Sequence, residues 1–129
     1  MQFKRSERVS ELLRHEISKL VQEIQNPKLG FVTITAVKVS DDLSEAKVFY
    51  SVYGSEEEKK ISGEILIRAV SFIRHSLGKR LESLKKVPTL KFIFDTTLEQ
   101  AQRINSILNQ IAQERTDDPA ENNSEQKPQ

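Results

Sequence analysis

The side chains best suited to chemistry in this sequence are cations that gather between residues 68 and 86. This stretch holds six lysines and arginines against one carboxylate, a local net charge of +5, and His75 lies among them. Gly78 falls within the cluster, and a glycine inside a helix costs about 1 kcal/mol relative to alanine. Clustered cations beside a weakened helix suit contact with the phosphates of a nucleic acid. The alternative is a helix that bends only to follow its core. From the side-chain chemistry of this stretch alone, we favour this alternative.

Side-chain constellations typical of enzymes are absent from the sequence. There is no cysteine, which excludes disulfides and thiolate metal ligands. The two histidines lack the spacing of a zinc site, and no glycine-rich nucleotide motif is present. Asp41, Asp42 and Asp95 could pair as acid and base, but Asp41-Asp42 is typical of a turn and Asp95 precedes a helix start. We therefore expect no catalytic residue, no metal ion and no cofactor.

The composition fits a single soluble domain. The 129 residues are 36% hydrophobic and 30% charged, with a net charge of +1. No apolar run approaches membrane-spanning length and the N-terminus lacks the apolar core of a signal peptide, so we expect a cytoplasmic protein. Residues 116–129 carry a net charge of −3 and no large apolar side chain. This composition predicts a disordered acidic tail. The remaining domain, residues 1–115, then carries a net charge of +4.

The first half of the chain predicts a helix followed by a β-hairpin. Apolar residues recur at three- and four-residue steps over residues 6–25, which is typical of a helix, and a proline follows it. Enrichment in Val, Thr and Ile predicts strands over residues 31–40 and 44–53. Asp41-Asp42 forms the turn between them, and a change in the apolar alternation predicts a bulge near Ala36.

The second half predicts two further helices on either side of one strand. Residues 55–58 (Ser-Glu-Glu-Glu) form a capping box, and the helix that they start is expected to bend at Ser76-Leu77-Gly78 and end near Leu84. Over residues 90–94, Leu90, Phe92 and Phe94 alternate with Lys91 and Ile93, and this period of two predicts a strand. A second capping box then opens a last helix that reaches about Arg115.

This order predicts an α+β domain, a three-stranded sheet with helices packed on one face. It is the order of type-II KH domains, in which a Gly-x-x-Gly turn between two helices clamps nucleic-acid backbone. Here Ser76-Leu77-Gly78 occupies the place of that turn. A helix-turn-helix DNA reader is disfavoured, because the second helix offers few side chains suited to base edges. Phe49 and Tyr53 could stack bases, but we expect the first or last helix to cover half of their sheet face.

Six segments keep a characteristic order and spacing between residues 4 and 110. They are residues 5–9 (Arg-Ser-Glu-Arg-Val), 26–30 (Asn-Pro-Lys-Leu-Gly), 37–48, 74–81 with Leu-Gly-Lys-Arg-Leu, 87–95 (Val-Pro-Thr-Leu-Lys-Phe-Ile-Phe-Asp) and 103–104. Together they resemble the ribosome-binding factor A family of bacterial small-subunit assembly factors. The resemblance implies a type-II KH-like fold in which an Ala-x-Gly kink replaces the Gly-x-x-Gly turn. Ser76 would then stand where alanine is usual.

The same resemblance implies a monomeric assembly factor that is not an enzyme. Members bind the immature 30S ribosomal subunit and its 16S rRNA, assist maturation of the 16S rRNA 5′ end, support growth in the cold and leave before translation begins. A GTPase of the same pathway is implicated in their release. The alternative is a KH-like domain that docks on ribosomal or regulatory proteins without RNA contact. Its binding would lack the steep salt dependence of phosphate contacts.

From their place in this expected fold, we predict that residues around Gly78 approach the rRNA backbone. The primary candidates are Arg74, Ser76, Gly78, Lys79 and Arg80. The secondary candidates are cations at the N-terminus, in the first loop and after the bent helix: Lys4, Arg5, Arg8, Lys28, Lys85 and Lys86. Each would contribute charge, so its loss should weaken binding with little change in sequence preference. A solvated surface position is the alternative for each of them.

Overall fold

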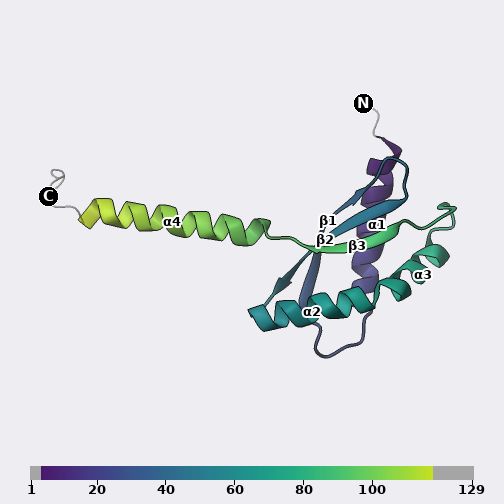
Figure 1. Cartoon of the computed structure of the whole chain (residues 1–129), viewed down its shortest axis with the longest axis horizontal. Helices are drawn as coiled ribbons and strands as arrows, with labels where there is room; N and C mark the ends of the chain where they lie inside the picture. Colours follow the sequence, from purple (N-terminus) through teal and green to yellow (C-terminus); the bar gives the residue numbers. More distant parts are fainter. Residues whose placement is uncertain (1–3, 118–129) are drawn as a thin grey trace. The chain divides into compact units, whose positions relative to one another are not determined.

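The computed structural model describes residues 4–117, in two compact units with their boundary between Asp95 and Thr96. Most of the predicted acidic tail, residues 118–129, lies outside the described residues. The first unit contains α1 (Arg5–Gln22), β1 (Phe31–Val39), β2 (Glu45–Tyr53), α2 (Glu56–Arg68), α3 (Val70–Arg80) and β3 (Thr89–Phe94), and the second contains α4 (Thr97–Asp117) (Figure 1). The order of elements is the predicted one, and it makes an α+β fold.

The local signals in the sequence place most element ends correctly. The capping box before α2 is confirmed, because the Glu58 amide donates to Ser55 Oγ at 3.2 Å and the Ser55 amide donates to Glu58 Oε1 at 2.9 Å. α1 ends at Gln22, three residues earlier than predicted, because the next two amides bond back only three residues. Such tightened turns are usual at helix ends.

The sheet has the order β1-β2-β3. β1 and β2 form the predicted antiparallel hairpin, while β3 pairs parallel to β2. The register shifts between Ile34 and Ala36, which confirms the predicted bulge. At the hairpin turn Asp42 Oδ1 accepts the Ser44 amide at 3.1 Å, and Leu43 takes a positive φ of 62°. The parallel pairing follows from the helical connection, since parallel strands need a long crossover.

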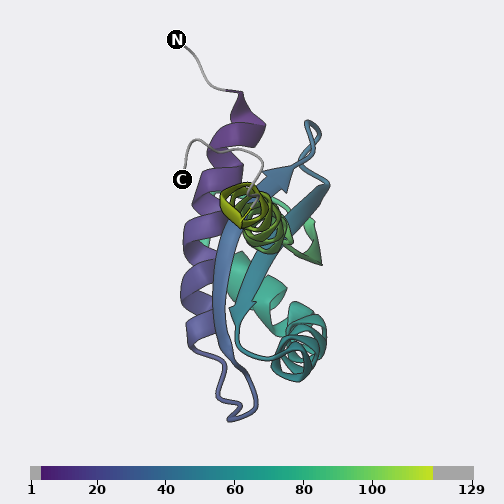
Figure 2. The ribbon, with the colours of Figure 1, turned by 90° about the vertical axis from the view of Figure 1, so that its left-hand side faces the viewer.

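The core lies between one face of the sheet and the three helices of the first unit. α1 runs alongside the strands (Figures 1 and 2). The even-numbered side chains of β2 are buried while their odd-numbered neighbours are not, so the helices pack on a single face. The fully buried side chains of this core include Leu13, Ile17, Val48, Leu66, Ile73 and Leu77. Burial of a leucine-sized side chain contributes about 1.5–3 kcal/mol, so these residues dominate the stability of the unit.

The bend predicted at Ser76-Leu77-Gly78 is wrong, because α3 is continuous through these residues and the helix breaks at Ala69 instead. α2 packs on β2 and β3, whereas α3 also packs on α1, so the two segments need different axes. The break therefore falls between Leu66 and Ile73, the buried residues that face these partners. The sequence at the break is Ala69-Val70-Ser71. Ser76 and Gly78, which the resemblance places at the kink, therefore do not form the helix break.

The second unit is the predicted last helix. α4 runs from Thr97 to Asp117, two residues past the predicted end. Its apolar side chains recur on one stripe, and those that are described are about half exposed: Ile104, Ile107, Leu108 and Ile111. The single domain of residues 1–115 stays a prediction.

Candidate RNA-binding surface

Exposed lysines flank the C-terminal end of α3. Lys79 lies in the last turn of the helix, and Lys85 and Lys86 lie in the loop that leads to β3. All three are exposed, and among residues 4–117 no carboxylate forms an ion pair with them. A helix C-terminus carries partial negative charge, which stabilises Lys79 there. The structure thus places three uncompensated cations around one loop, where an anionic partner can reach them.

Arg74 has a structural role in the same region. Its Nε donates to the Pro88 carbonyl at 3.1 Å and its Nη2 donates to the Val87 carbonyl at 3.0 Å. Pro88 is fully buried, so these bonds fix the loop where it enters β3. The planar guanidinium suits two neighbouring acceptors, which a lysine could not match. Arg74 therefore shapes the surface that carries the exposed lysines.

Arg80 connects α3 with α1. One guanidinium nitrogen donates to Glu23 Oε2 at 2.7 Å, and the other lies 3.7 Å from Glu16 Oε1. The hydrogen bond to Glu23, together with the negative charge of both carboxylates, raises the pKa of Arg80 above its ordinary value. Two acids thus offset the charge of this predicted candidate.

Ser76 and Gly78 occupy ordinary helical positions in α3. Ser76 is half-buried and Gly78 is exposed. A Cβ at Gly78 would lie 3.7 Å from Val87 Cγ2, which is normal van der Waals contact. The glycine is therefore not required by the packing of this chain. An exposed helical glycine does leave the backbone accessible to a partner.

The secondary candidates do not gather on one surface. Lys4, Arg5 and Arg8 are exposed at the start of α1. Lys28 is exposed in the loop after α1, where its amide donates to Asn26 Oδ1 at 2.9 Å. α1 has 18 residues, so its ends are about 27 Å apart. A single partner that contacts both groups would have to span about 27 Å.

Sequence reasoning missed three strand lysines on the sheet face opposite the core: Lys38, Lys47 and Lys91. Of the two helices expected to cover half of this face, the first does not, since α1 packs on the other face. Within residues 4–95 no helix lies over it, and Tyr53 is 85% exposed there. The alternation of the strands together with the hairpin register could have revealed these lysines.

The described part of the chain holds neither a cluster of metal ligands nor a helix suited to a membrane. No group of three or more His, Cys, Asp or Glu side chains there could hold a metal ion. None of its helices is both long and apolar enough to cross a membrane.

Comparison with known proteins identifies similar chains. The family model described as Ribosome-binding factor A matches residues 5–108. A ribosome-binding factor A from Desulfitobacterium hafniense is 40% identical over 122 residues, covering 94% of this chain and 97% of the relative. The solution NMR structure of a Thermotoga maritima protein described as a putative ribosome binding factor A is 32% identical and has a TM-score of 0.62, covering 69% of this chain and 85% of that one.

One further structure shares the fold at lower identity. It is a homology model of ribosome binding factor A from Thermus thermophilus, fitted into the cryo-EM map of a 30S complex. It is 24% identical and has a TM-score of 0.58, covering 67% of this chain and 91% of that one.

Proposed function

The chain belongs to the ribosome-binding factor A family, and on this basis we propose that it is an assembly factor that binds the immature small ribosomal subunit. The single observation that carries this proposal is the family match, which covers most of the chain. The Thermus thermophilus relative in a 30S complex supports it, because that protein has the same fold. No catalytic step is part of the proposal.

The surface that we propose for rRNA contact is centred on Lys79, Lys85 and Lys86. Their charges are exposed and without a carboxylate partner among the described residues. Binding to phosphate would release counterions from the RNA and gain free energy that depends on salt. Arg74 and Arg80 would act mainly by holding the loop and α3 in place, since both have partners within the chain.

In cells, the proposed role is late maturation of the 30S subunit in the cytoplasm. It includes processing of the 16S rRNA 5′ end, a requirement during growth in the cold, and release with the help of a GTPase. Deletion of the gene should then raise the fraction of 5′-extended 16S rRNA precursor, and should do so more at low temperature. A normal precursor fraction at both temperatures would reject this part of the proposal.

One observation favours the alternative of protein docking. Ile67 in α2 is 64% exposed and Phe72 in α3 is 50% exposed, so apolar side chains are displayed on the helix that carries Lys79 and on the helix before it. Exposed apolar side chains of this size are common at protein interfaces. A ribosomal protein could therefore share the contact with rRNA.

Co-sedimentation with immature small subunits at two salt concentrations tests the proposal. The variant Lys79→Gln/Lys85→Gln/Lys86→Gln should bind more weakly than wild type at low salt. Its salt slope should fall by about 2 to 3, since each lost phosphate contact removes roughly 0.7 to 0.9.

A matched control removes three charges elsewhere, in Arg14→Gln/Lys19→Gln/Lys60→Gln, and should bind like wild type. Wild-type chain that fails to sediment with subunits at low salt would reject the function. Equal binding by the lysine variant and its control would reject the surface while leaving the function intact.

A further inference from the structure

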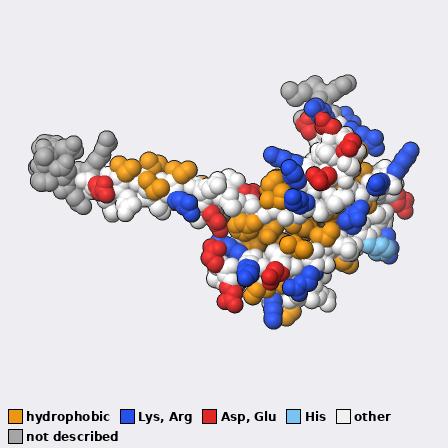
Figure 3. Space-filling model, in the orientation of Figure 1, with side chains coloured by type: hydrophobic (Ala, Val, Ile, Leu, Met, Phe, Trp, Pro, Cys, Tyr) orange, Lys and Arg blue, Asp and Glu red, His pale blue; other side chains and the backbone are white. Residues whose placement is uncertain are grey.

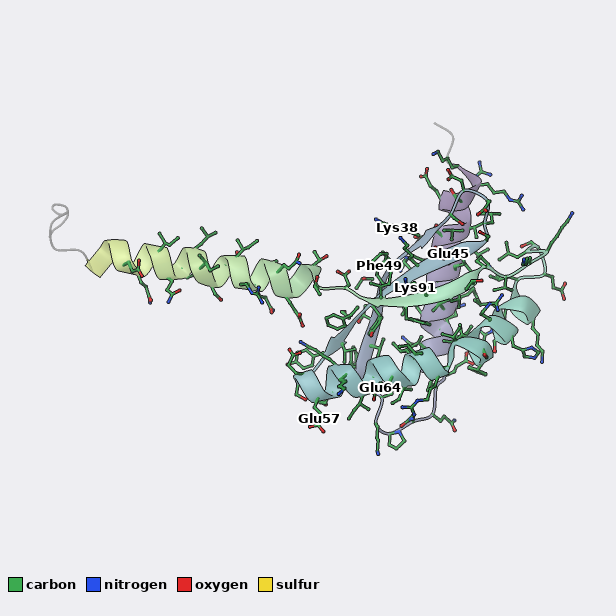
Figure 4. The ribbon with its side chains drawn as sticks, viewed as in Figure 1. Lys38, Glu45, Phe49, Glu57, Glu64 and Lys91 are labelled. Carbon is green, nitrogen blue, oxygen red and sulfur yellow. The ribbon has the colours of Figure 1, made fainter. Side chains whose placement is uncertain are left out.

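Three lysines lie in one row across the sheet. Lys38 of β1 is the direct partner of Lys47 of β2, and Lys47 is the direct partner of Lys91 of β3. All three are exposed on the face opposite the core. Figure 4 shows Lys38 and Lys91 close to Phe49 over the strands, and Figure 3 shows basic side chains beside hydrophobic ones over the sheet.

This row needs an explanation, because like charges directly opposite each other destabilise a sheet. Lysines on edge strands often serve to prevent association between sheets. That role fits Lys38 and Lys91, since β1 and β3 are the edges. It does not fit Lys47, which lies in the central strand. A bound anion would relieve the repulsion at all three positions.

An aromatic and apolar surface lies beside the lysine row on the same face. Phe49 of β2 pairs with Ala36 on one side and with Ile93 on the other. Lys38 Nζ lies 5.7 Å from the centroid of the Phe49 ring, a cation–π contact. Tyr53 follows four residues along the same strand face. Aromatic rings beside cations on an open sheet provide stacking for bases next to charge for phosphates.

Carboxylates on this face are fewer than the lysines. Glu45 lies on the same face as the row, two residues before Lys47 in β2, and is paired with Thr89 (Figure 4). Asp95, past the end of β3, accepts the Thr35 hydroxyl at 2.6 Å. None of the three lysines forms an ion pair within residues 4–117, so they keep their positive potential.

We propose that the open face of the sheet is a second RNA-binding surface, which takes an unpaired strand with its phosphates on Lys38, Lys47 and Lys91 and a base on Phe49. The inference rests on the proposed function for the class of ligand, RNA, and assigns to this face the single-stranded part. The lysines around α3 then contact folded RNA by charge, while the sheet holds a flexible segment. Stacking on a ring tolerates every base, so sequence preference is weak.

Fluorescence anisotropy with a labelled oligouridine of about 12 nucleotides tests the proposal on the full chain. The variant Lys38→Gln/Lys47→Gln/Lys91→Gln should lower the salt slope by about 2, since each contact with a single strand contributes roughly 0.7. The ratio of wild-type to variant affinity should therefore be about 100-fold larger at 0.1 M salt than at 1 M salt. Phe49→Leu, which keeps an apolar side chain, should lose about 5-fold to 100-fold.

Thermal stability separates a binding role from a structural one. Lys47→Gln should leave the melting temperature unchanged or higher, because it removes like-charge repulsion, and should still weaken RNA binding. The control Arg14→Gln/Lys19→Gln/Lys60→Gln should keep the affinity for oligouridine. Retained affinity in the sheet variant, or an equal loss in the control, would overturn the inference.

The inference and the proposed function can fail separately. Wild-type chain that sediments with subunits but does not bind oligouridine at low salt would overturn the inference alone. A sheet variant that loses binding to an acidic protein but not to oligouridine would also overturn it. Chain that binds oligouridine but not subunits would reject the proposed function and keep the sheet surface.

Discussion

Gly63 is a buried glycine whose replacement has a definite structural cost. It is buried in α2, and a Cβ built there would lie 2.6 Å from the hydroxyl oxygen of Tyr50. The tyrosine cannot easily move, because its ring packs edge-on against Phe92 at 6.2 Å and Phe94 at 5.6 Å. Gly63→Ala should therefore force a shift in a close-packed layer, which typically costs about 1–3 kcal/mol.

The helix propensity of alanine opposes this cost. Alanine in place of glycine stabilises a helix interior by about 1 kcal/mol. The net effect of Gly63→Ala should be a loss of about 1 kcal/mol in the free energy of unfolding. In a Tyr50→Phe background the hydroxyl is gone, and the nearest ring atom lies 3.8 Å from the new Cβ. There Gly63→Ala should gain about 1 kcal/mol, so that the two substitutions couple by about 2 kcal/mol.

Urea denaturation followed by circular dichroism measures all four corners of this cycle. The Tyr50→Phe variant supplies the control, since it tests the loss of the hydroxyl by itself. The reasoning fails if Gly63→Ala has the same sign in both backgrounds. It also fails if the single variant is more stable than wild type, because the close approach would then carry no cost.

Three further predictions concern other contacts of the first unit. Gly78→Ala should raise the free energy of unfolding by about 1 kcal/mol in urea titrations, because α3 is regular there and space is available. A lower free energy of unfolding would instead favour the bend predicted at Gly78. Ser62→Ala should lower it by about 1–3 kcal/mol, because the buried Ser62 hydroxyl accepts the Gly30 amide at 2.8 Å, and an unchanged midpoint would refute this. Serine hydroxyls at the hairpin lower the pKa of Asp42 to about 2 from 3.8, so Asp42 should stabilise the fold above pH 4 and lose this contribution as pH falls towards 2. An NMR titration that finds an ordinary pKa for Asp42 would contradict the turn geometry.

Features that depend on a few neighbouring residues were predictable from the sequence. The capping box at Ser55 and the bulge near Ala36 are local, and both are confirmed. The helix break was not, because Gly78 is an obvious signal whereas Ala69 is not. The position of the break depends on which helices and strands α2 and α3 contact, and that is a property of the folded chain. Local propensity therefore misplaced the kink by about two helical turns.

The candidate surface was only partly predictable for the same reason. A sequence shows that Arg74 is a cation but not that its guanidinium holds the carbonyls of Val87 and Pro88. It shows Lys38 and Lys47 in two predicted strands, but their direct pairing depends on the register that the hairpin turn sets. Charge is a property of composition, whereas its availability to a partner is decided by the contacts made within the fold.

Arginines and lysines divide the structural and binding roles in this chain. Arg74 and Arg80 each engage two acceptors, which suits the planar fork of a guanidinium. Lysines, which act as point charges on flexible stems, supply exposed cations both at the end of α3 and on the sheet. Neutralising either arginine would change the shape of the surface together with its charge. Substitutions at the lysines alone separate these effects, so they are the variants from which an RNA contact can be inferred.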